Sequence, residues 1–265
     1  MKLFISSDIE GTCGIAHWDE TDKNKNDYPH FALQMSREVS AACEGALKGG
    51  AGEILVKDAH DFARNIDPEL LPKQVKIFRG WTRDPYSMMA GIDESFHGVI
   101  FTGYHSAAGM AGNPLSHTMN TRNNQVLING TVASELMINS LTAAMCGVPV
   151  RMVTGDEMLC EWIQSVNPNI LTVPVSRGIG NASISIHPQL AVERIRETAE
   201  KAMALEGAAC MFPLPEHFEV EVNYKDHFMA YRNSFYPGAK QLDSRRVRFE
   251  ADDYKQVLAF FHFCL

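Results

Sequence analysis

The sequence lacks the features that define several large classes of protein. No window approaches the roughly 18 apolar residues of a membrane span. The apolar stretch after Lys2 meets Asp8 too soon to form the hydrophobic region of a signal peptide. The six cysteines lie far apart without a C-x-x-C pair, which favours reduced thiols in a cytosol over a disulfide framework. We therefore expect a soluble, cytoplasmic protein that does not associate with membranes.

A concentrated positive charge is also missing. The net charge is −8 and the basic residues are scattered, so the sequence has no electrostatic footprint for DNA or RNA. The short cluster Arg245-Arg246-Val-Arg248 alternates like the solvated face of a strand. With 265 residues, 45% hydrophobic and 21% charged, the chain has the composition and length of a globular enzyme with one large domain and a smaller appendage.

Short apolar runs alternate with segments of helical periodicity along most of the chain. Strands are predicted at 3–5, 53–60, 75–80, 98–105, 149–156 and 170–175, and helices at 31–46, 134–145, 156–166 and 188–206. Asn129-Gly130 between two apolar runs is a strong hairpin signal. This alternation predicts an α/β fold with a largely parallel central sheet flanked by helices. We assign residues 1–210 to that domain and 211–265 to a small C-terminal α+β lobe packed on it.

The first strand ends in two carboxylates. Because side chains alternate along a strand, Asp8 and Glu10 can project to the same side where the strand ends, and Gly11 lets the chain turn away. Buried paired carboxylates need a cation or a proton to offset their charge, and a metal is the leading explanation. Cys13 lies close by, where a buried apolar filler is a more frequent role than a reactive thiol.

Two further strands end in histidine, at His60 and His105. In open parallel sheets, ligands bind outside the carboxyl ends of the strands, so these side chains and the acidic pair should meet at one edge. Each histidine alone would more often be structural, but the combination indicates a metal site. Nitrogen and carboxylate ligands without thiolates suit zinc, manganese or iron better than calcium.

Three other polar residues have both an ordinary and a functional interpretation. Glu135 opens a predicted helix, where an acid complements the helix dipole. His117 lies in a loop and would ordinarily be solvated, yet opposite a metal it could act in acid–base or nucleophilic catalysis. Asp156 ends a strand at the same edge, and we favour a helix N-cap over a partner of the metal site.

Five short motifs lie in one order along the first 160 residues. They are Asp8-x-Glu10-Gly11, Asp58-Ala-His60, Gly103-Tyr-His105, Ser116-His117-Thr-Met119 and Asn129-Gly130…Ser134-Glu135. Each is weak alone, but together they closely resemble the D-aminopeptidase family of zinc metallopeptidases. The departures are Thr118 within the fourth motif and an N-terminal loop with His17 and Trp18, which is a candidate lining of the substrate pocket.

The resemblance implies a zinc-dependent aminopeptidase that releases N-terminal residues, D-residues among them, from short peptides. By that resemblance a two-zinc centre has Asp8 as its bridging ligand, and the full ligand set is Asp8, Glu10, His60, His105 and Glu135. His117 matches the catalytic histidine of the family. We expect it to pass a proton to the leaving amine rather than to attack the carbonyl. The resemblance also implies a ring-shaped homo-oligomer whose sites face an internal chamber.

Two rival functions fit the residues less well. One is a metal-dependent hydrolase of another bond, such as a phosphoesterase or an amidohydrolase. A phosphate site usually has basic residues near the metals, and Lys57 and Arg122 are the only nearby candidates. The other is a non-catalytic metal-binding protein, but structural zinc sites favour closed cysteine and histidine sets.

Overall fold

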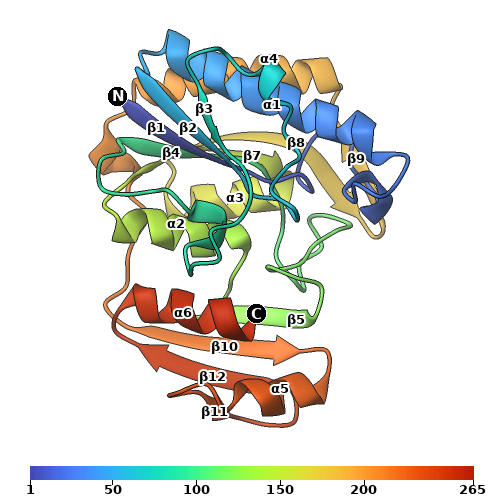
Figure 1. Cartoon of the computed structure of the whole chain (residues 1–265), viewed down its shortest axis with the longest axis vertical. Coiled ribbons are helices and arrows are strands. Elements are labelled where there is room, and N and C mark those ends of the chain that lie inside the picture. The colour runs from blue at the N-terminus through green and yellow to red at the C-terminus, as the bar shows by residue number, and fades with distance from the viewer.

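The computed structural model describes residues 1–265 and contains two β-sheets with helices around them (Figure 1). The strands of the larger sheet are β1 (Lys2–Ser7), β2 (Glu53–Asp58), β3 (Lys76–Phe78), β4 (Gly98–Tyr104), β7 (Val150–Asp156), β8 (Leu171–Ile179) and β9 (Ala182–Ser185). They lie in the order β3-β2-β1-β4-β7-β8-β9. All neighbours are parallel except β8 and β9, which form an antiparallel pair at one edge.

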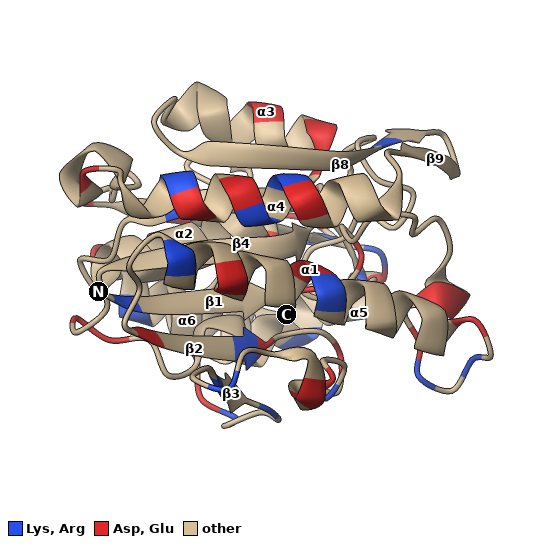
Figure 2. Ribbon diagram, turned by 90° about the horizontal axis from the view of Figure 1, so that it is seen from above, with Lys and Arg blue, Asp and Glu red and all other residues tan.

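Helices cover both faces of this sheet. On one face α1 (Tyr28–Lys48) and α4 (Pro188–Met203) lie side by side, and both carry acidic and basic residues along their length (Figure 2). A Cβ on Gly45 of α1 would collide with the main-chain oxygen of Arg196, so the two helices approach closely because this position is glycine. On the other face lie α2 (Glu135–Met145) and α3 (Glu157–Val166). This arrangement confirms the predicted α/β fold.

The smaller sheet is antiparallel and forms the lower lobe in Figure 1. Its strands are β5 (Asn123–Ile128), β6 (Thr131–Val132), β10 (Phe218–Tyr224), β11 (Lys240–Gln241) and β12 (Arg246–Ala251). They lie in the order β11-β12-β10-β5-β6. The β5–β6 turn has φ of 49° at Asn129 and 76° at Gly130, which confirms the predicted hairpin. The sheet thus joins strands from the middle and the end of the chain, and the predicted division at residue 210 stays a prediction.

Two helices complete this lobe, α5 (His227–Asn233) and α6 (Tyr254–Cys264). Helix α6 lies between the smaller sheet and the main body, where the Tyr254 hydroxyl donates to the main-chain oxygen of Ile138 on α2 at 2.8 Å. One continuous hydrophobic core therefore runs from the α2 face of the larger sheet into the lobe. The sequence patterns did not predict β9 or α5, which are short and largely exposed.

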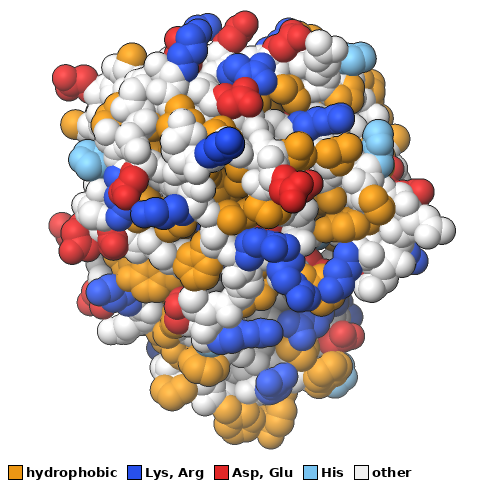
Figure 3. All heavy atoms as spheres, turned by 45° about the horizontal axis from the view of Figure 1, so that its top comes forward, with side chains coloured by type: hydrophobic (Ala, Val, Ile, Leu, Met, Phe, Trp, Pro, Cys, Tyr) orange, Lys and Arg blue, Asp and Glu red, His pale blue; other side chains and the backbone are white.

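The surface and the thiols match the sequence expectations. All six cysteines are free. Arg248 pairs with Glu221 across neighbouring strands, as expected for a solvated strand face. On the face drawn in Figure 3, basic, acidic and hydrophobic side chains are mixed over the upper part, and hydrophobic side chains gather at the lower tip. No helix is both long and apolar enough to cross a bilayer.

Candidate active site

The parallel strands bring the candidate residues to one edge of the larger sheet. Ser7 of β1 pairs with Asp58 of β2 and Thr102 of β4, so the segments that follow the three strands leave the sheet side by side. Asp8, His60 and His105 lie on these segments and are buried. Glu135 joins them from the first turn of α2, and His117 from the loop that precedes β5.

The turn after β1 depends on glycine. A Cβ on Gly11 would collide with the main-chain oxygen of Tyr104, and the Gly11 N–H donates to Gly103 O at 2.8 Å. Gly103 itself has a φ of 68°, a region that other residues disfavour. This close approach brings Glu10 and His105 to the same place, as the two motifs predicted.

The two carboxylate oxygens of Asp8 face two different sets of donors. Asp8 Oδ1 lies 3.4 Å from His60 Nδ1, and that nitrogen lies 3.1 Å from Glu10 Oε2. Asp8 Oδ2 lies 3.5 Å from His105 Nε2, which lies 3.7 Å from Glu135 Oε2. We call Asp8, Glu10 and His60 the first donor group, and Asp8, His105 and Glu135 the second. The structure therefore brings together all five residues of the predicted ligand set.

Main-chain carbonyls orient all three histidines. His60 Nε2 lies 2.9 Å from Thr21 O, and His105 Nδ1 lies 2.9 Å from Ser106 O. A carbonyl only accepts, so His60 Nε2 and His105 Nδ1 carry a proton. The other nitrogen of each ring, His60 Nδ1 and His105 Nε2, faces its donor group and could bind a metal after losing its own proton. A histidine whose outer N–H is held in this way is the usual arrangement of a metal ligand.

The cluster is incomplete without a cation. Glu10 Oε2 and His105 Nε2 are buried and lack hydrogen-bond partners, a condition that buried polar atoms rarely tolerate. Burial raises the pKa of Glu135 to about 8. Burial alone would lower the pKa of His105. The nearby carboxylates of Glu135 and Asp8 have a larger, opposite effect and raise that pKa to about 10. The buried carboxylates need compensating positive charge, which a metal could supply in place of protons at these atoms, so the residues fit the zinc ions that the resemblance implies.

His117 occupies a different place from the other two histidines. Its ring stacks on that of His105 with centroids 4.4 Å apart. The ring of Trp18 packs against it edge to face, with centroids 5.3 Å apart. Its Nδ1 lies 2.9 Å from Leu115 O, which leaves Nε2 free, 3.5 Å from Glu135 Oε1. Burial and the neighbouring His105 lower the pKa of His117, so its ring is neutral and can accept a proton.

Asp156 and Glu135 each have the ordinary role at the start of a helix that the sequence suggested, and each also contacts a part of the candidate site. Asp156 caps α3 by accepting from Leu159 N, as predicted, and its carboxylate also accepts from Ser106 N at 2.6 Å. It thereby fixes the residue whose carbonyl orients His105. Glu135 lies in the first turn of α2 and accepts from Met119 N at 2.7 Å.

A family model described as D-aminopeptidase matches residues 1–263. The chain belongs to the D-aminopeptidase family. This membership confirms the sequence prediction of an aminopeptidase, made from the five motifs.

Two comparisons place this chain beside known proteins. It is 29% identical over 256 residues to the D-aminopeptidase of Bacillus subtilis (strain 168), an alignment that covers 96% of this chain and 92% of the relative. Its fold superposes with a TM-score of 0.91 on the Zn-dependent D-aminopeptidase DppA from Bacillus subtilis, described as a self-compartmentalizing protease. That match has 27% identity and covers 100% of this chain and 96% of DppA.

The candidate active site opens through two connected cavities. The inner cavity, about 260 Å³, adjoins both donor groups and is also lined by Asp61, Trp81, Ser87 and Met119. The outer cavity, about 430 Å³, shares Glu10, His60, Asp61, His117 and Met119 with the inner one and extends to Trp18. The suggested role of the N-terminal loop in lining a pocket thus has a geometric basis.

Sequence reasoning did not single out Asp61, Trp81 or Met119 as lining this site. Asp61 directly follows His60 and could have been found from that proximity. Trp81 lies in an irregular loop, where its Nε1 donates to Asp61 O at 2.6 Å. No spacing in the sequence signals that contact.

Proposed function

We propose that the protein is a dinuclear zinc enzyme that releases the N-terminal residue, D-residues among them, from short peptides. The observation that carries the proposal is the orientation of Asp8, whose two oxygens face separate donor groups. Such a carboxylate suits a bridge between two metal ions. Glu10 and His60 would complete one zinc site, and His105 and Glu135 the other. Bound zinc would supply an activated water and polarise the scissile carbonyl.

The carboxylates have a second use in an aminopeptidase. Three of them would offset three of the four positive charges of two zinc ions. This carboxylate-rich set differs from the closed cysteine and histidine sets of structural zinc sites. The acidic lining continues outward through Asp61, which both cavities share, and Asp22 in the outer cavity. Negative charge along the entrance favours the protonated amino terminus of an approaching peptide.

We assign to His117 the transfer of a proton to the leaving amine. Its free Nε2 faces the inner cavity, and its neutral state lets it take a proton before giving it up. Trp18 and His105 enclose the two faces of its ring and keep it in place. A potential ligand atom of His117 also lies within 4.8 Å of ligand atoms of His105 and Glu135, so His117 could instead bind a metal. The zinc content of a His117→Ala variant distinguishes the two roles.

The geometry argues against a phosphoesterase. Lys57 Nζ donates to the main-chain oxygens of Asp58 and Gly80 and lies 4.3 Å from the Trp81 ring centroid, behind the cavity wall. Arg122 donates to the main-chain oxygen of Leu265 at 2.7 Å and does not line the inner cavity. The two basic candidates are therefore engaged elsewhere, and neither is available to a phosphate group at the donor groups.

We propose a ring-shaped homo-oligomer in a reducing, cytoplasmic compartment. DppA is described as self-compartmentalizing, and this chain has large exposed aromatics on its lobe, of which Phe235 is 71% and Phe263 is 67% exposed. Exposed apolar groups of this kind favour burial against another copy. The six free cysteines favour a reducing environment.

Metal analysis of the purified protein, combined with hydrolysis of matched D- and L-aminoacyl amides, tests the proposal. We expect two zinc ions per chain and release of the amino acid from at least one enantiomeric series. Phosphoryl chromogenic substrates serve as the control and should not react. Two zinc ions without amide hydrolysis would support the metal site and refute the function.

A further inference from the structure

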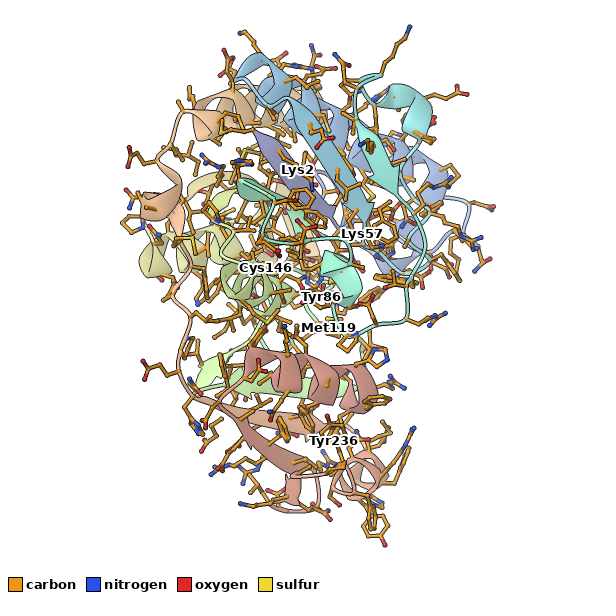
Figure 4. The ribbon with its side chains drawn as sticks, turned by 60° about the vertical axis from the view of Figure 1, so that its left-hand side comes forward. Lys2, Lys57, Tyr86, Met119, Cys146 and Tyr236 are labelled. Carbon is orange, nitrogen blue, oxygen red and sulfur yellow. The ribbon has the colours of Figure 1, made fainter.

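A third cavity, which we call the side cavity, adjoins the inner cavity and takes no part in the chemistry proposed above. It encloses about 190 Å³ between the loop at residues 85–87, helix α2 and helix α6. Its apolar wall is formed mainly by Tyr86, Met119, Ile138, Leu258 and Phe261. Figure 4 shows Tyr86 and Met119 close to one another above α6. The side cavity therefore lies where the main body meets the lobe.

The side cavity and the inner cavity share two lining residues, Ser87 and Met119. Both have left-handed backbones, with φ of 48° and 64°, which residues other than glycine rarely adopt. Such conformations persist where the surroundings hold them, and they cluster at ligand sites. The Met119 N–H donates to Glu135 at 2.7 Å, so the shared wall is tied to a candidate metal ligand.

The α2 side of the side cavity is tied to the same residue. Ile138 follows Glu135 by three positions on α2, so the two side chains lie on one face of the helix. Ile138 is buried, and its main-chain oxygen accepts from Tyr254 of α6. The side cavity is consequently held at a fixed position relative to the proposed zinc site.

We propose that the side cavity is the specificity pocket that receives an apolar side chain of the N-terminal residue of the peptide. This inference rests on the proposed aminopeptidase function. An apolar cavity of about 150 Å³ in another protein binds benzene, so this volume suffices for a branched aliphatic or aromatic side chain. The outer cavity is larger and mostly polar, which suits the remainder of the peptide. An aminopeptidase needs this asymmetry, because only one residue lies on the amino side of the bond that it cleaves.

The proposal gives the C-terminal lobe a part in substrate selection. Leu258 and Phe261 lie on α6, so the lobe supplies one wall of the side cavity, while α2 and the loop at residues 85–87 supply the others. Only 4% of Leu258 is exposed, and its truncation would widen the side cavity without touching either donor group.

The test compares kcat/KM for glycyl p-nitroanilide, which is achiral, with kcat/KM for alanyl, leucyl and phenylalanyl p-nitroanilides of the enantiomer that the zinc-loaded wild-type enzyme hydrolyses. We expect the wild type to prefer leucyl over glycyl by at least about tenfold, since each methylene in a fitted apolar pocket contributes about 10- to 200-fold. Leu258→Ala should lower the leucyl-to-glycyl ratio by about tenfold or more. Val257→Ala is the matched control, because Val257 is buried on the same helix but does not line the side cavity.

Tyr86→Ala provides a second variant on a half-buried loop residue, in case Leu258→Ala does not fold. A ratio that falls in either folded variant and stays constant in Val257→Ala supports the pocket. Unchanged ratios in active Leu258→Ala and Tyr86→Ala enzymes would overturn the pocket while the aminopeptidase function stands. If the wild type hydrolyses none of the anilides, the function and the pocket are refuted together.

Discussion

Replacing Asp8 by Asn tests the central feature of the proposed zinc site. The substitution keeps the size of the side chain but removes one negative charge and one ligand oxygen. Because the two oxygens of Asp8 face separate donor groups, both zinc ions should be lost. Glu10→Gln is the matched control, since Glu10 belongs to the first donor group alone. It should weaken only one zinc ion.

The expected size of the effect follows from the electrostatics of the cluster. Two unit charges about 4 Å apart interact by about 4 kcal/mol at an effective dielectric constant of about 20. A change of that size weakens binding by about a thousandfold, because each tenfold corresponds to about 1.4 kcal/mol. A dication doubles the charge, so this is a lower bound for each zinc ion next to Asp8.

The assay is zinc content by mass spectrometry after dialysis against a series of chelators of increasing affinity. We expect Asp8→Asn to lose both ions at a chelator strength at which Glu10→Gln still holds about one and the wild type about two. Unfolding curves of the metal-free proteins check that the two variants remain folded. Equal zinc losses in the two variants would refute the bridging role of Asp8.

Three further predictions concern single residues. His117→Ala should lower turnover by about 10²- to 10⁴-fold with zinc content unchanged, and loss of zinc would identify His117 as a ligand instead. Burial raises the pKa of Glu38 to about 7, so the folded protein holds a proton that the unfolded chain releases above about pH 4.5. That stabilisation is complete at low pH and is lost as the pH rises through 7, by up to about 3 kcal/mol. In denaturant unfolding, Glu38→Gln should therefore have a higher free energy of unfolding than the wild type at pH 8 but not at pH 5. Free energies of unfolding that change with pH in the same way in both proteins would contradict this reasoning. Burial and the nearby Glu38 raise the pKa of Cys13 to about 12, whereas Cys146 is only partly buried. Mass mapping after brief alkylation of the native protein should therefore find Cys146 modified before Cys13. The reverse order would show that Cys13 is reactive.

The sequence predicted the parts of the site that depend on local periodicity. Asp8 and Glu10 at positions i and i+2 of a strand end, and His60 and His105 after neighbouring strands, follow from the alternation of side chains and the common edge of a parallel sheet. The carbonyl partners of the histidines did not follow, because a contact such as that of His60 with Thr21 O depends on how a distant loop folds back.

The lobe was harder to anticipate for a related reason. Its hairpin at Asn129-Gly130 was visible in the sequence, but the pairing of β5 with β10 joins residues 92 to 101 positions apart. Strand propensity does not specify such partners. Met119, which lines all three cavities, has a left-handed backbone that methionine disfavours, and its N–H donates to Glu135, a long-range contact that no local pattern signals.

The carbonyl oxygens that orient the three histidines have a consequence for the way this enzyme can evolve. Thr21, Ser106 and Leu115 hold the rings through main-chain atoms, which every amino acid possesses. Sequence drift at these three positions can therefore alter the surroundings of the site while the ring orientations persist. Related enzymes that share the backbone path can acquire new loops and new substrates without rebuilding the catalytic centre.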